Sequence, residues 1–447
     1  MTSYIVRDNR NLRFSVFCLF FAGVLIASTC GMLKSLDSSV ARGSHSQIPV
    51  QEKALSASAF INSIGVNTHL SYFDCTYGNF ALVKQEVRSI GIRHLRDGIH
   101  LQDSAYNAKL YDRWIELGRL GIRFDAVVDP RNQLGPVTPA LLQHIEQLAG
   151  NTIESFVGPN ELDISGMADW VAVDRDYQKD IFSSVQSLPA PRPLVIAPSL
   201  AFVNNGKAFG GNVGAFDEGN LHPYPAGKMP SVVFSEQLEL ARTVFGDKPI
   251  AITESGYHNA INDLRDQPAV SEPAAAKYIP RLVLENFTKQ IARTYLYELF
   301  DVRPDPGFAR NAMHWGLVRA DGTEKPAFVA VKNLIQELND IAEPKPPFEF
   351  SWTLSDSNPA IHHLLLKKSN GLFDLVLWQE VSSYSRGLRG DQENPAVETM
   401  LIMGKKARRV TLFEPVLQEA PLKRYADAMS VRLSIPDHPL VVEIEPE

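Results

Sequence analysis

The sequence predicts an α/β protein in which a (β/α)8 TIM barrel is followed by a small C-terminal antiparallel β-sandwich domain. Short apolar runs alternate with longer amphipathic stretches throughout residues 59–343, and eight such pairs can be counted. After residue 348 this rhythm gives way to segments that alternate apolar and polar residues. The first pattern is typical of βα units and the second of antiparallel strands. A span of this length suits a barrel, which usually takes about 250 residues.

The chain begins with an apolar segment. The 20 residues Phe14–Leu33 carry no charge, and Arg7, Arg10 and Arg13 precede them. A bilayer core about 30 Å thick is spanned by roughly 20 apolar residues, whereas a cleaved signal usually has a shorter core. Residues 1–33 are therefore predicted to be a signal peptide or a signal anchor retained in the membrane. Both alternatives place the remainder outside the cytoplasm, as a secreted, periplasmic or membrane-anchored protein.

The composition narrows the class of partner. Residues 34–58 are rich in Ser, Ala and Gln, which predicts a flexible tether. The formal net charge is −7, so there is no basic excess with which to bind nucleic acid. Cys75 is the only cysteine beyond the apolar leader, so no internal disulfide is expected in the folded body.

Each predicted barrel strand is a short apolar run, and nearly every run has a polar residue or two at or near its end. The strands are Ile61–Leu70, Ile92–Ile99, Ile122–Asp129, Ile153–Asp163, Leu194–Leu200, Phe216–Pro225, Pro249–His258 and Arg293–Asp301. Amphipathic helices are predicted at 107–120, 139–149, 170–188, 231–245, 273–292 and 325–339. No glycine-rich dinucleotide or phosphate-loop motif occurs, which argues against a doubly wound nucleotide-binding fold.

A proline-rich linker separates the two predicted domains. Pro344, Pro346 and Pro347 end the last barrel helix. Residues 348–447 then form the β domain. Its predicted strands are Phe348–Leu354, His362–Lys368, Leu372–Gln379, Ala407–Phe413 and Val431–Ile435. Asn370-Gly371, between two of these, is a strong hairpin signal.

Two glutamates end two of the predicted barrel strands. Glu161 follows the fourth apolar run and Glu254 the seventh, each at the carboxyl end of its strand. Catalytic groups of barrel enzymes lie at that end. Two carboxylates facing one pocket can cleave a glycosidic bond, because one protonates the leaving oxygen while the other attacks the anomeric carbon. The alternative for Glu161 is an exposed loop carboxylate or a charge at a helix N-terminus, and the alternative for Glu254 is an ion pair at a strand end.

Period-two spacing brings further polar residues to the same edge. His222 and Tyr224 share a face, although His-Pro-Tyr-Pro could also be a rigid turn. Arg96 lies on the second strand, where its charge could keep the pKa of Glu254 low; pairing with Asp97 in solvent is the alternative. His69 ends the first strand and could equally be structural.

The order of these motifs resembles glycoside hydrolase clan A. Asn160-Glu161 after the fourth strand, His222-x-Tyr224 after the sixth and Glu254 at the seventh are similar to family 39 and to related bacterial exopolysaccharide hydrolases. The resemblance implies a retaining O-glycoside hydrolase. It implies Glu161 as acid/base, Glu254 as nucleophile and Asn160 as donor to the sugar 2-hydroxyl. It also implies that Tyr224 donates to the nucleophile, that His222 lies near the sugar and that Trp315 forms a stacking platform.

The resemblance also implies a polysaccharide or oligosaccharide partner, with the membrane as a second partner if the leader is retained. Two rival functions share the barrel. One is a carbohydrate-binding or scaffold protein without turnover, and the other is a metal-dependent hydrolase. The latter would need clustered ligands such as His-x-His on the first strand, but Asn67-Thr68-His69 lacks the first histidine. No metal or cofactor is therefore expected.

Overall fold

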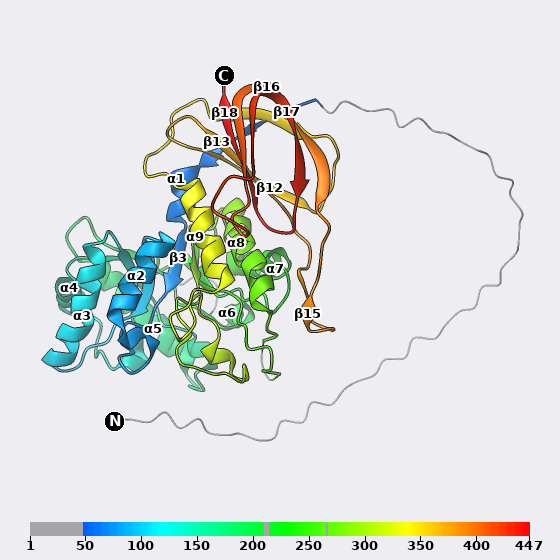
Figure 1. The fold of residues 1–447 in the computed structure, drawn as a ribbon. Helices are drawn as coiled ribbons and strands as arrows, with labels where there is room; N and C mark the ends of the chain where they lie inside the picture. The colour runs from blue at the N-terminus through cyan, green and yellow to red at the C-terminus, as the bar shows by residue number, and fades with distance from the viewer. Residues whose placement is uncertain (1–47, 210–213, 265–266) are drawn as a thin grey trace, which may run out of the picture. The chain divides into compact units, whose positions relative to one another are not determined.

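The computed structural model describes residues 48–447 except 210–213 and 265–266 (Figure 1). The apolar leader and most of the predicted tether lie outside these residues. Within the described part of the chain, no helix is both long enough and apolar enough to cross a membrane.

The predicted barrel is confirmed by a sheet of eight parallel strands. Their order is β7-β6-β5-β4-β3-β10-β9-β8, and a parallel bridge between Ile196 and Glu218 joins the two end strands. The strands are β3 Ile64–Asn67, β4 His94–Gly98, β5 Arg123–Val127, β6 Ile153–Val157, β7 Leu194–Ile196, β8 Gly219–Leu221, β9 Ile250–Ser255 and β10 Arg293–Leu296.

Every barrel strand is shorter than its predicted range, chiefly because residues at the carboxyl ends lie in the loops that follow. The first strand also starts later than predicted, because Ile61 and Asn62 end the helix α1 Ala57–Asn62. β8 ends at Leu221, so His222 and Tyr224 belong to the loop after it. Inside the barrel, Val127, Val157, Ile196 and Ala251 form a small buried cluster. Such a layer of branched and small side chains makes the barrel a packed core and leaves its carboxyl end to carry polar groups.

Helices cover the outside of the barrel. They are α1 Ala57–Asn62, α2 Phe80–Ile90, α3 Ser104–Gly118, α4 Pro139–Leu148, α5 Trp170–Gln186, α6 Gly206–Phe209, α7 Pro230–Phe245, α8 Glu272–Thr288 and α9 Pro326–Leu338. Six of them, α3, α4, α5, α7, α8 and α9, are close to the predicted ranges, whereas α1, α2 and α6 correspond to no predicted helix. In α3, Trp114 is fully buried and stacks on Phe124 of β5 with ring centroids 4.1 Å apart. The apolar face of the helix is thereby fixed against the sheet.

The β domain is one eight-stranded sheet, largely antiparallel. Its main path runs β1-β11-β16-β18-β13-β12-β2, and β17 pairs with β16. The strands are β1 Val50–Lys53, β2 Leu55–Ser56, β11 Glu349–Leu354, β12 Ile361–Lys367, β13 Phe373–Gln379, β16 Val397–Phe413, β17 Lys423–Ile435 and β18 Leu440–Pro446; β14 Tyr384–Ser385 and β15 Gly390–Asp391 form a separate hairpin.

Part of the predicted tether belongs to this sheet, which corrects both the tether and the start of the β domain. β1 pairs with β11 and β2 pairs with β12, so one short segment joins the two ends of the sheet. The sequence VQEKALS has neither the length nor the regular alternation of a strand. Its pairing depends on partners about 300 residues away, which local pattern does not reveal.

The β domain packs on the barrel through β13, whose two faces are both buried. Phe373, Leu375 and Leu377 face the core of the β domain. Val376 and Trp378 belong to the core shared with the barrel helices. The Trp378 Nε1 donates to Glu285 Oε1 of α8 at 3.0 Å. The sheet is therefore held on the barrel by apolar burial and by hydrogen bonds in the same contact.

Candidate active site

Glu161 is held in an uncommon backbone conformation. β6 ends at Val157, and Gly158 follows where a Cβ would lie 2.1 Å from Gln178 Oε1. Glu161 itself has φ 50° and ψ 47°, the left-handed region that non-glycine residues rarely occupy. Its N–H donates to Ser199 O at 3.0 Å. Strain of this kind is stored at functional positions, and here it aims the carboxylate across the barrel mouth.

Glu254 lies on β9, and charged neighbours set its ionisation. Its Oε1 accepts from Arg96 Nη1 at 2.7 Å, and its Oε2 accepts from the Tyr224 hydroxyl at 2.8 Å. Burial alone would raise the pKa of this carboxyl. The charges of His222 and Arg96, together with these hydrogen bonds, outweigh burial and lower the pKa below its usual value. Glu254 is therefore held in its ionised form.

Arg96 joins three strands by hydrogen bonds. Nη1 also donates to Asn67 Oδ1 at 3.0 Å, and Nη2 donates to Asn160 Oδ1 at 2.7 Å. Asn160 Oδ1 accepts a second bond from Ser199 Oγ at 3.0 Å. Because both bonds fix Oδ1, the amide orientation is set, and Nδ2 has no hydrogen-bond partner among the described residues. This N–H group is available to donate to a substrate hydroxyl.

A chain of hydrogen bonds fixes the tautomer of His222. Asn220 Nδ2 donates to Ala197 O, which leaves Asn220 Oδ1 to accept the Thr253 hydroxyl proton at 2.7 Å. Thr253 Oγ1 has no other proton, so at 2.8 Å it accepts from His222 Nε2. His222 Nδ1 then faces Glu161 Oε1 at 2.7 Å. One proton must lie between these two atoms, on the imidazole or on the carboxyl, so the Glu161–His222 pair shares a proton.

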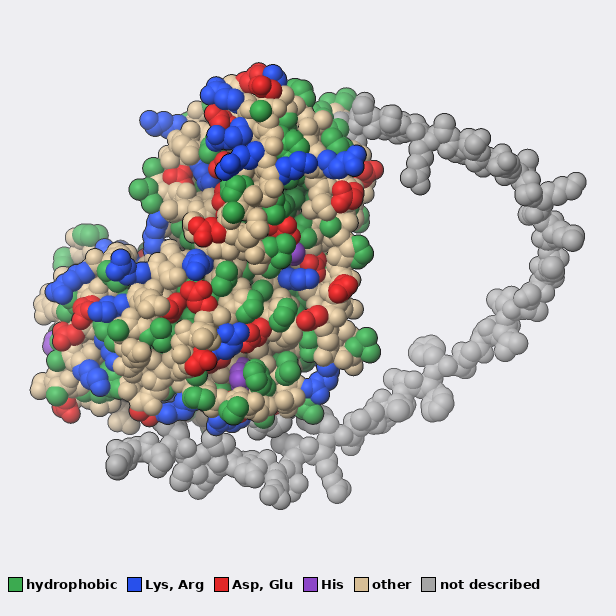
Figure 2. Space-filling view, viewed as in Figure 1, with side chains coloured by type: hydrophobic (Ala, Val, Ile, Leu, Met, Phe, Trp, Pro, Cys, Tyr) green, Lys and Arg blue, Asp and Glu red, His purple; other side chains and the backbone are tan. Residues whose placement is uncertain are grey.

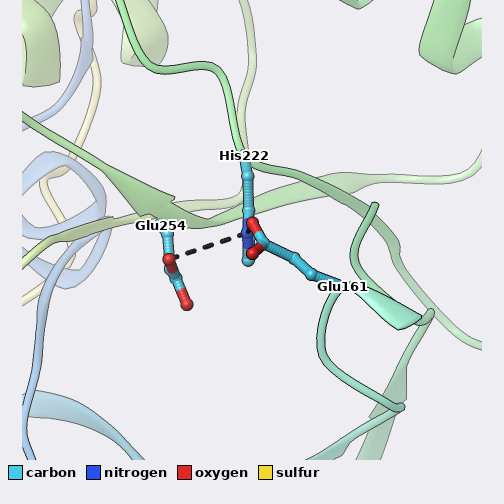
Figure 3. A group of neighbouring side chains, drawn as sticks. All are labelled: Glu161, His222 and Glu254. Atoms are coloured by element: carbon cyan, nitrogen blue, oxygen red, sulfur yellow. Dashed lines mark hydrogen bonds and ion pairs between the residues drawn. The ribbon is translucent and has the colours of Figure 1, made fainter. Parts of the chain in front are cut away.

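The two carboxylates meet across this histidine. Figure 3 shows Glu161 and Glu254 converging on His222, whose Nδ1 lies 3.7 Å from Glu254 Oε2. An oxygen of each carboxylate and a ring nitrogen all lie within 4.8 Å of one another. The Glu161 and Glu254 side chains are 21% and 11% exposed, so a ligand in solvent can reach both.

The same three side chains are the group best placed to hold a metal ion in the described part of the chain. The surrounding donors oppose that use. Arg96 places a positive charge 2.7 Å from Glu254, and Tyr224 donates a hydrogen bond to its other oxygen. A cation would have to displace both contacts, so the site is better suited to chemistry by the carboxylates themselves.

Aromatic rings form one wall of the site. Trp315 contacts Tyr224 with ring centroids 4.9 Å apart and lies 4.8 Å from the ring of His258. The next residue is Gly316, where a Cβ would lie 1.9 Å from Asp301 N. Only glycine fits there, which lets the Trp315 segment lie directly against the backbone that follows β10. Trp315 is partly exposed and can offer a face to a sugar ring.

His69 lies beside the carboxylates but is bound to another acid. Its Nε2 lies 3.1 Å from Glu298 Oε2, which also accepts from the Tyr77 hydroxyl at 3.1 Å. Burial lowers the pKa of His69, but the carboxylates of Glu298, Asp97 and Glu254 raise it by more. The side chain is 24% exposed and its ring stacks on Tyr72. The neighbouring acids therefore favour the protonated form of His69, which is partly accessible at the barrel mouth.

The structure brings the predicted site residues to one end of the barrel. Hydrogen bonds join Glu254, Asn160, Arg96 and Tyr224, and the hydrogen-bonded pair Glu161 and His222 meets them through the 3.7 Å contact between His222 and Glu254; Trp315 and His69 lie at the sides. Sequence reasoning missed Asn220, Thr253 and Ser199, whose small polar side chains carry no distinctive signal. It also missed Glu298, although that carboxylate lies near the end of a predicted strand and could have been found by the same rule.

Comparison with solved structures gives several matches over most of the chain. A family 39 glycoside hydrolase from the gut symbiont Bacteroides cellulosilyticus WH2 aligns with TM-score 0.61 and 13% identity, covering 87% of this chain and 82% of that one. A family 39 enzyme from Xanthomonas axonopodis pv. citri aligns with TM-score 0.56 and 14% identity, covering 92% and 100%. A monomeric β-xylosidase from Caulobacter crescentus CB15 gives 0.54 and 14%, covering 88% and 97%.

These likenesses establish the fold. The chain has the barrel and accessory β domain of family 39 glycoside hydrolases, which confirms the fold resemblance expected from the motifs. No protein-family model matches the sequence, and no curated protein matches it significantly.

Proposed function

We propose that this chain is a retaining glycoside hydrolase that cleaves O-glycosidic bonds of a polysaccharide or oligosaccharide. The observation that carries the proposal is the pairing of two unlike carboxyl groups. Glu254 is held ionised while Glu161 shares a proton with His222, and one oxygen of Glu161 lies within 4.8 Å of one oxygen of Glu254. A retaining mechanism needs carboxyl groups about 5–5.5 Å apart, whereas an inverting enzyme needs about 6.5–9.5 Å.

In the first step Glu254 attacks the anomeric carbon and the glycosidic C–O bond breaks. Glu161 gives its proton to the leaving oxygen, and a covalent glycosyl ester forms on Glu254. In the second step Glu161 removes a proton from water, the water oxygen attacks the same carbon, and the ester bond breaks to return Glu254 as a carboxylate. Two inversions give net retention.

The neighbouring residues have roles that follow from their contacts. Arg96 and Tyr224 hold the nucleophile ionised and oriented. Asn160 Nδ2 is placed to donate to the sugar 2-hydroxyl, a contact that strengthens in the transition state. His222 lies between the carboxylates, where it exchanges the proton that Glu161 delivers. Structures of similar fold that are described as family 39 glycoside hydrolases and a β-xylosidase support the same activity.

The test is a pair of variants assayed on a panel of aryl glycosides and extracellular polysaccharides. Glu254→Gln should lose at least about 10⁴-fold in kcat with unchanged circular dichroism, because the nucleophile is gone. Glu161→Ala should lose several orders of magnitude, and azide should restore turnover on an activated substrate as a glycosyl azide. Glu349→Gln, an exposed carboxylate of the β domain, is the control that keeps activity.

Two outcomes would contradict the assignment. Wild-type turnover that survives in either variant would remove these glutamates from the mechanism. A wild-type chain that binds glycans without cleaving any would favour the alternative, a non-catalytic carbohydrate-binding protein on the same barrel. Proton NMR of the first-formed product decides between retention and inversion.

A further inference from the structure

The β domain sends an extension to the mouth of the barrel. This arm, residues 380–396 between β13 and β16, includes the hairpin β14–β15 and runs beside α7 in Figure 1. Tyr278 OH of α8 accepts hydrogen bonds from the N–H groups of Ser383 and Tyr384 at 2.8 and 3.1 Å. Arg389 donates to the carbonyl of Ile261 in the loop after β9. The arm is therefore attached both to α8 and to the loop that follows β9, the strand that carries Glu254.

A pocket of about 360 Å³ lies between this arm and the loop after β8. The loop contributes Gly227, Lys228 and Met229, and the arm contributes Ser382, Tyr384, Ser385, Arg386 and Gln392. The same loop carries Tyr224, only three residues before Gly227. Three residues span at most about 11 Å, so the pocket lies near the proposed catalytic group.

The charge of the pocket is one-sided. Its lining holds two cations, Lys228 and Arg386, and no carboxylate. Neither side chain has an ion pair or hydrogen bond within the residues that the structure describes, and both are exposed. Arg409 of the β domain, by contrast, is paired with Glu445 at 3.2 Å. In a chain of net charge −7, two unpaired cations around one hollow favour an anionic ligand.

The rest of the lining suits a sugar. Ser382, Ser385 and Gln392 supply hydroxyl and amide groups that can exchange hydrogen bonds with sugar hydroxyls. Met229 and Val232 add apolar surface for the C–H face of a ring. Arginine pairs with carboxylates through two parallel hydrogen bonds, so Arg386 is the natural partner for a carboxylate on such a ring.

We propose that this pocket is a distal subsite that binds a carboxylate-bearing sugar unit, so that the substrate is an acidic polysaccharide whose chain continues to Glu161 and Glu254. The inference rests on the proposed hydrolase function, because that function requires the polysaccharide to run from the pocket to Glu161 and Glu254. Binding of the polysaccharide can nevertheless be measured without turnover. It also gives the β domain a role in recognising substrate.

The experiment measures binding by the full chain carrying Glu254→Gln. The probes are polygalacturonate, alginate and hyaluronan, each compared with its carboxyl-reduced form by isothermal titration at low salt. We expect at least one acidic polymer to bind about tenfold more tightly than its reduced form. Adding Lys228→Gln and Arg386→Ala should remove that tenfold preference, because both cations that would pair with the carboxylates are then gone. The preference should also shrink at 0.5 M salt.

The control removes two cations elsewhere. Lys and Arg side chains gather over the β domain at the top of Figure 2. Within that domain, Lys405 of β16 and Arg432 of β17 are exposed. Lys405→Gln with Arg432→Ala should leave the preference intact. The proposal is overturned if no acidic polymer is preferred, if the pocket variant keeps the preference, or if the control loses as much. Binding that survives when the Glu161 and Glu254 tests fail would overturn the hydrolase function alone.

Discussion

The neighbours of Glu254 keep its carboxyl ionised, although burial alone would favour the neutral form. Burial disfavours the carboxylate, and Arg96, His222 and Tyr224 each favour it by charge or hydrogen bond. The pKa of Tyr224 shifts in the opposite direction, since burial and the charge of Glu254 raise it well above the usual value. The phenol therefore stays protonated and remains a donor to the nucleophile.

Replacing that donor should move the acid limb of the activity profile. Tyr224→Phe removes a hydrogen bond to the ionised form of Glu254, so the pKa of Glu254 should rise. The carboxylate is then lost at a higher pH, and the acid limb of kcat/KM should shift upward, with kcat falling about 10²-fold. A pH series on an activated aryl glycoside measures both effects.

The matched control is Tyr111→Phe, whose hydroxyl donates to His100 O in a buried site. It removes the same atom without touching Glu254 and should leave the limb in place. An acid limb that stays put in Tyr224→Phe would show that another group titrates there.

Local pattern identifies the charged members of the site because strand ends in a barrel converge. The rule found Glu161, Glu254 and Arg96 from apolar runs alone. It could not find Thr253 or Asn220, which matter only because they orient His222. Their role depends on a hydrogen-bond chain across neighbouring strands, and small polar residues inside a buried strand give no sign of such a chain in sequence.

At the scale of elements, α8 joins the two parts of the fold. Arg281 is fully buried in this helix and pairs with Glu380 Oε2 at 2.7 Å. Its Nη1 donates to the carbonyl of Asp437, and the Nη2 of that pair also donates to the carbonyl of Val381, at 3.0 Å each. These partners lie in the β domain and at the base of the arm, so a single guanidinium fixes α8 against both.

Removing this side chain should destabilise the whole fold. Arg281→Ala leaves Glu380 and two carbonyls buried without their donor, and loss of one partner of a buried pair costs about 3–5 kcal/mol. Arg281→Lys should recover little of this, because one ammonium cannot replace three directed donors. Urea unfolding followed by fluorescence measures the change.

Arg408→Ala serves as the comparison, since Arg408 is 67% exposed and its pair with Glu445 should contribute less than about 1 kcal/mol. Equal midpoints for Arg281→Ala and Arg408→Ala would contradict the structural role. The role of Arg281 could not be predicted from the sequence, because a buried arginine in an amphipathic helix has the same pattern as a surface arginine. β1 and β2 were not predicted for a related reason, since their pairing is set by distant partners.

Across the whole molecule, several acids are protonated in the fold at a pH where they would be ionised in the unfolded chain. Burial raises the pKa of Glu146, Glu218 and Glu337 to about 7 and that of Asp97 to about 6. Asp174, fully buried in α5, has its pKa raised to about 8 by burial and by Asp129 and Asp163.

Stability should therefore fall from mildly acidic to mildly alkaline pH. A buried acid with a raised pKa binds more protons in the fold than when unfolded, so the free energy of unfolding decreases as pH rises between the two pKa values. Asp437, by contrast, has a lowered pKa, because hydrogen bonds led by His438 outweigh burial, and its contribution is lost only in acid. We expect the melting temperature to peak near pH 5 and to decline through pH 8.

Asp174→Asn should flatten the decline, because the amide cannot ionise. The free energy of unfolding of the variant, relative to wild type, should grow with pH by at most about 1.4 kcal/mol per pH unit and level off above about pH 8. Thermal melts of both chains from pH 4.5 to 9 measure this, with Asp176→Asn on the exposed side of α5 as control. A wild-type melting temperature that rises between pH 5 and 8 would mean that these acids are ionised in the fold.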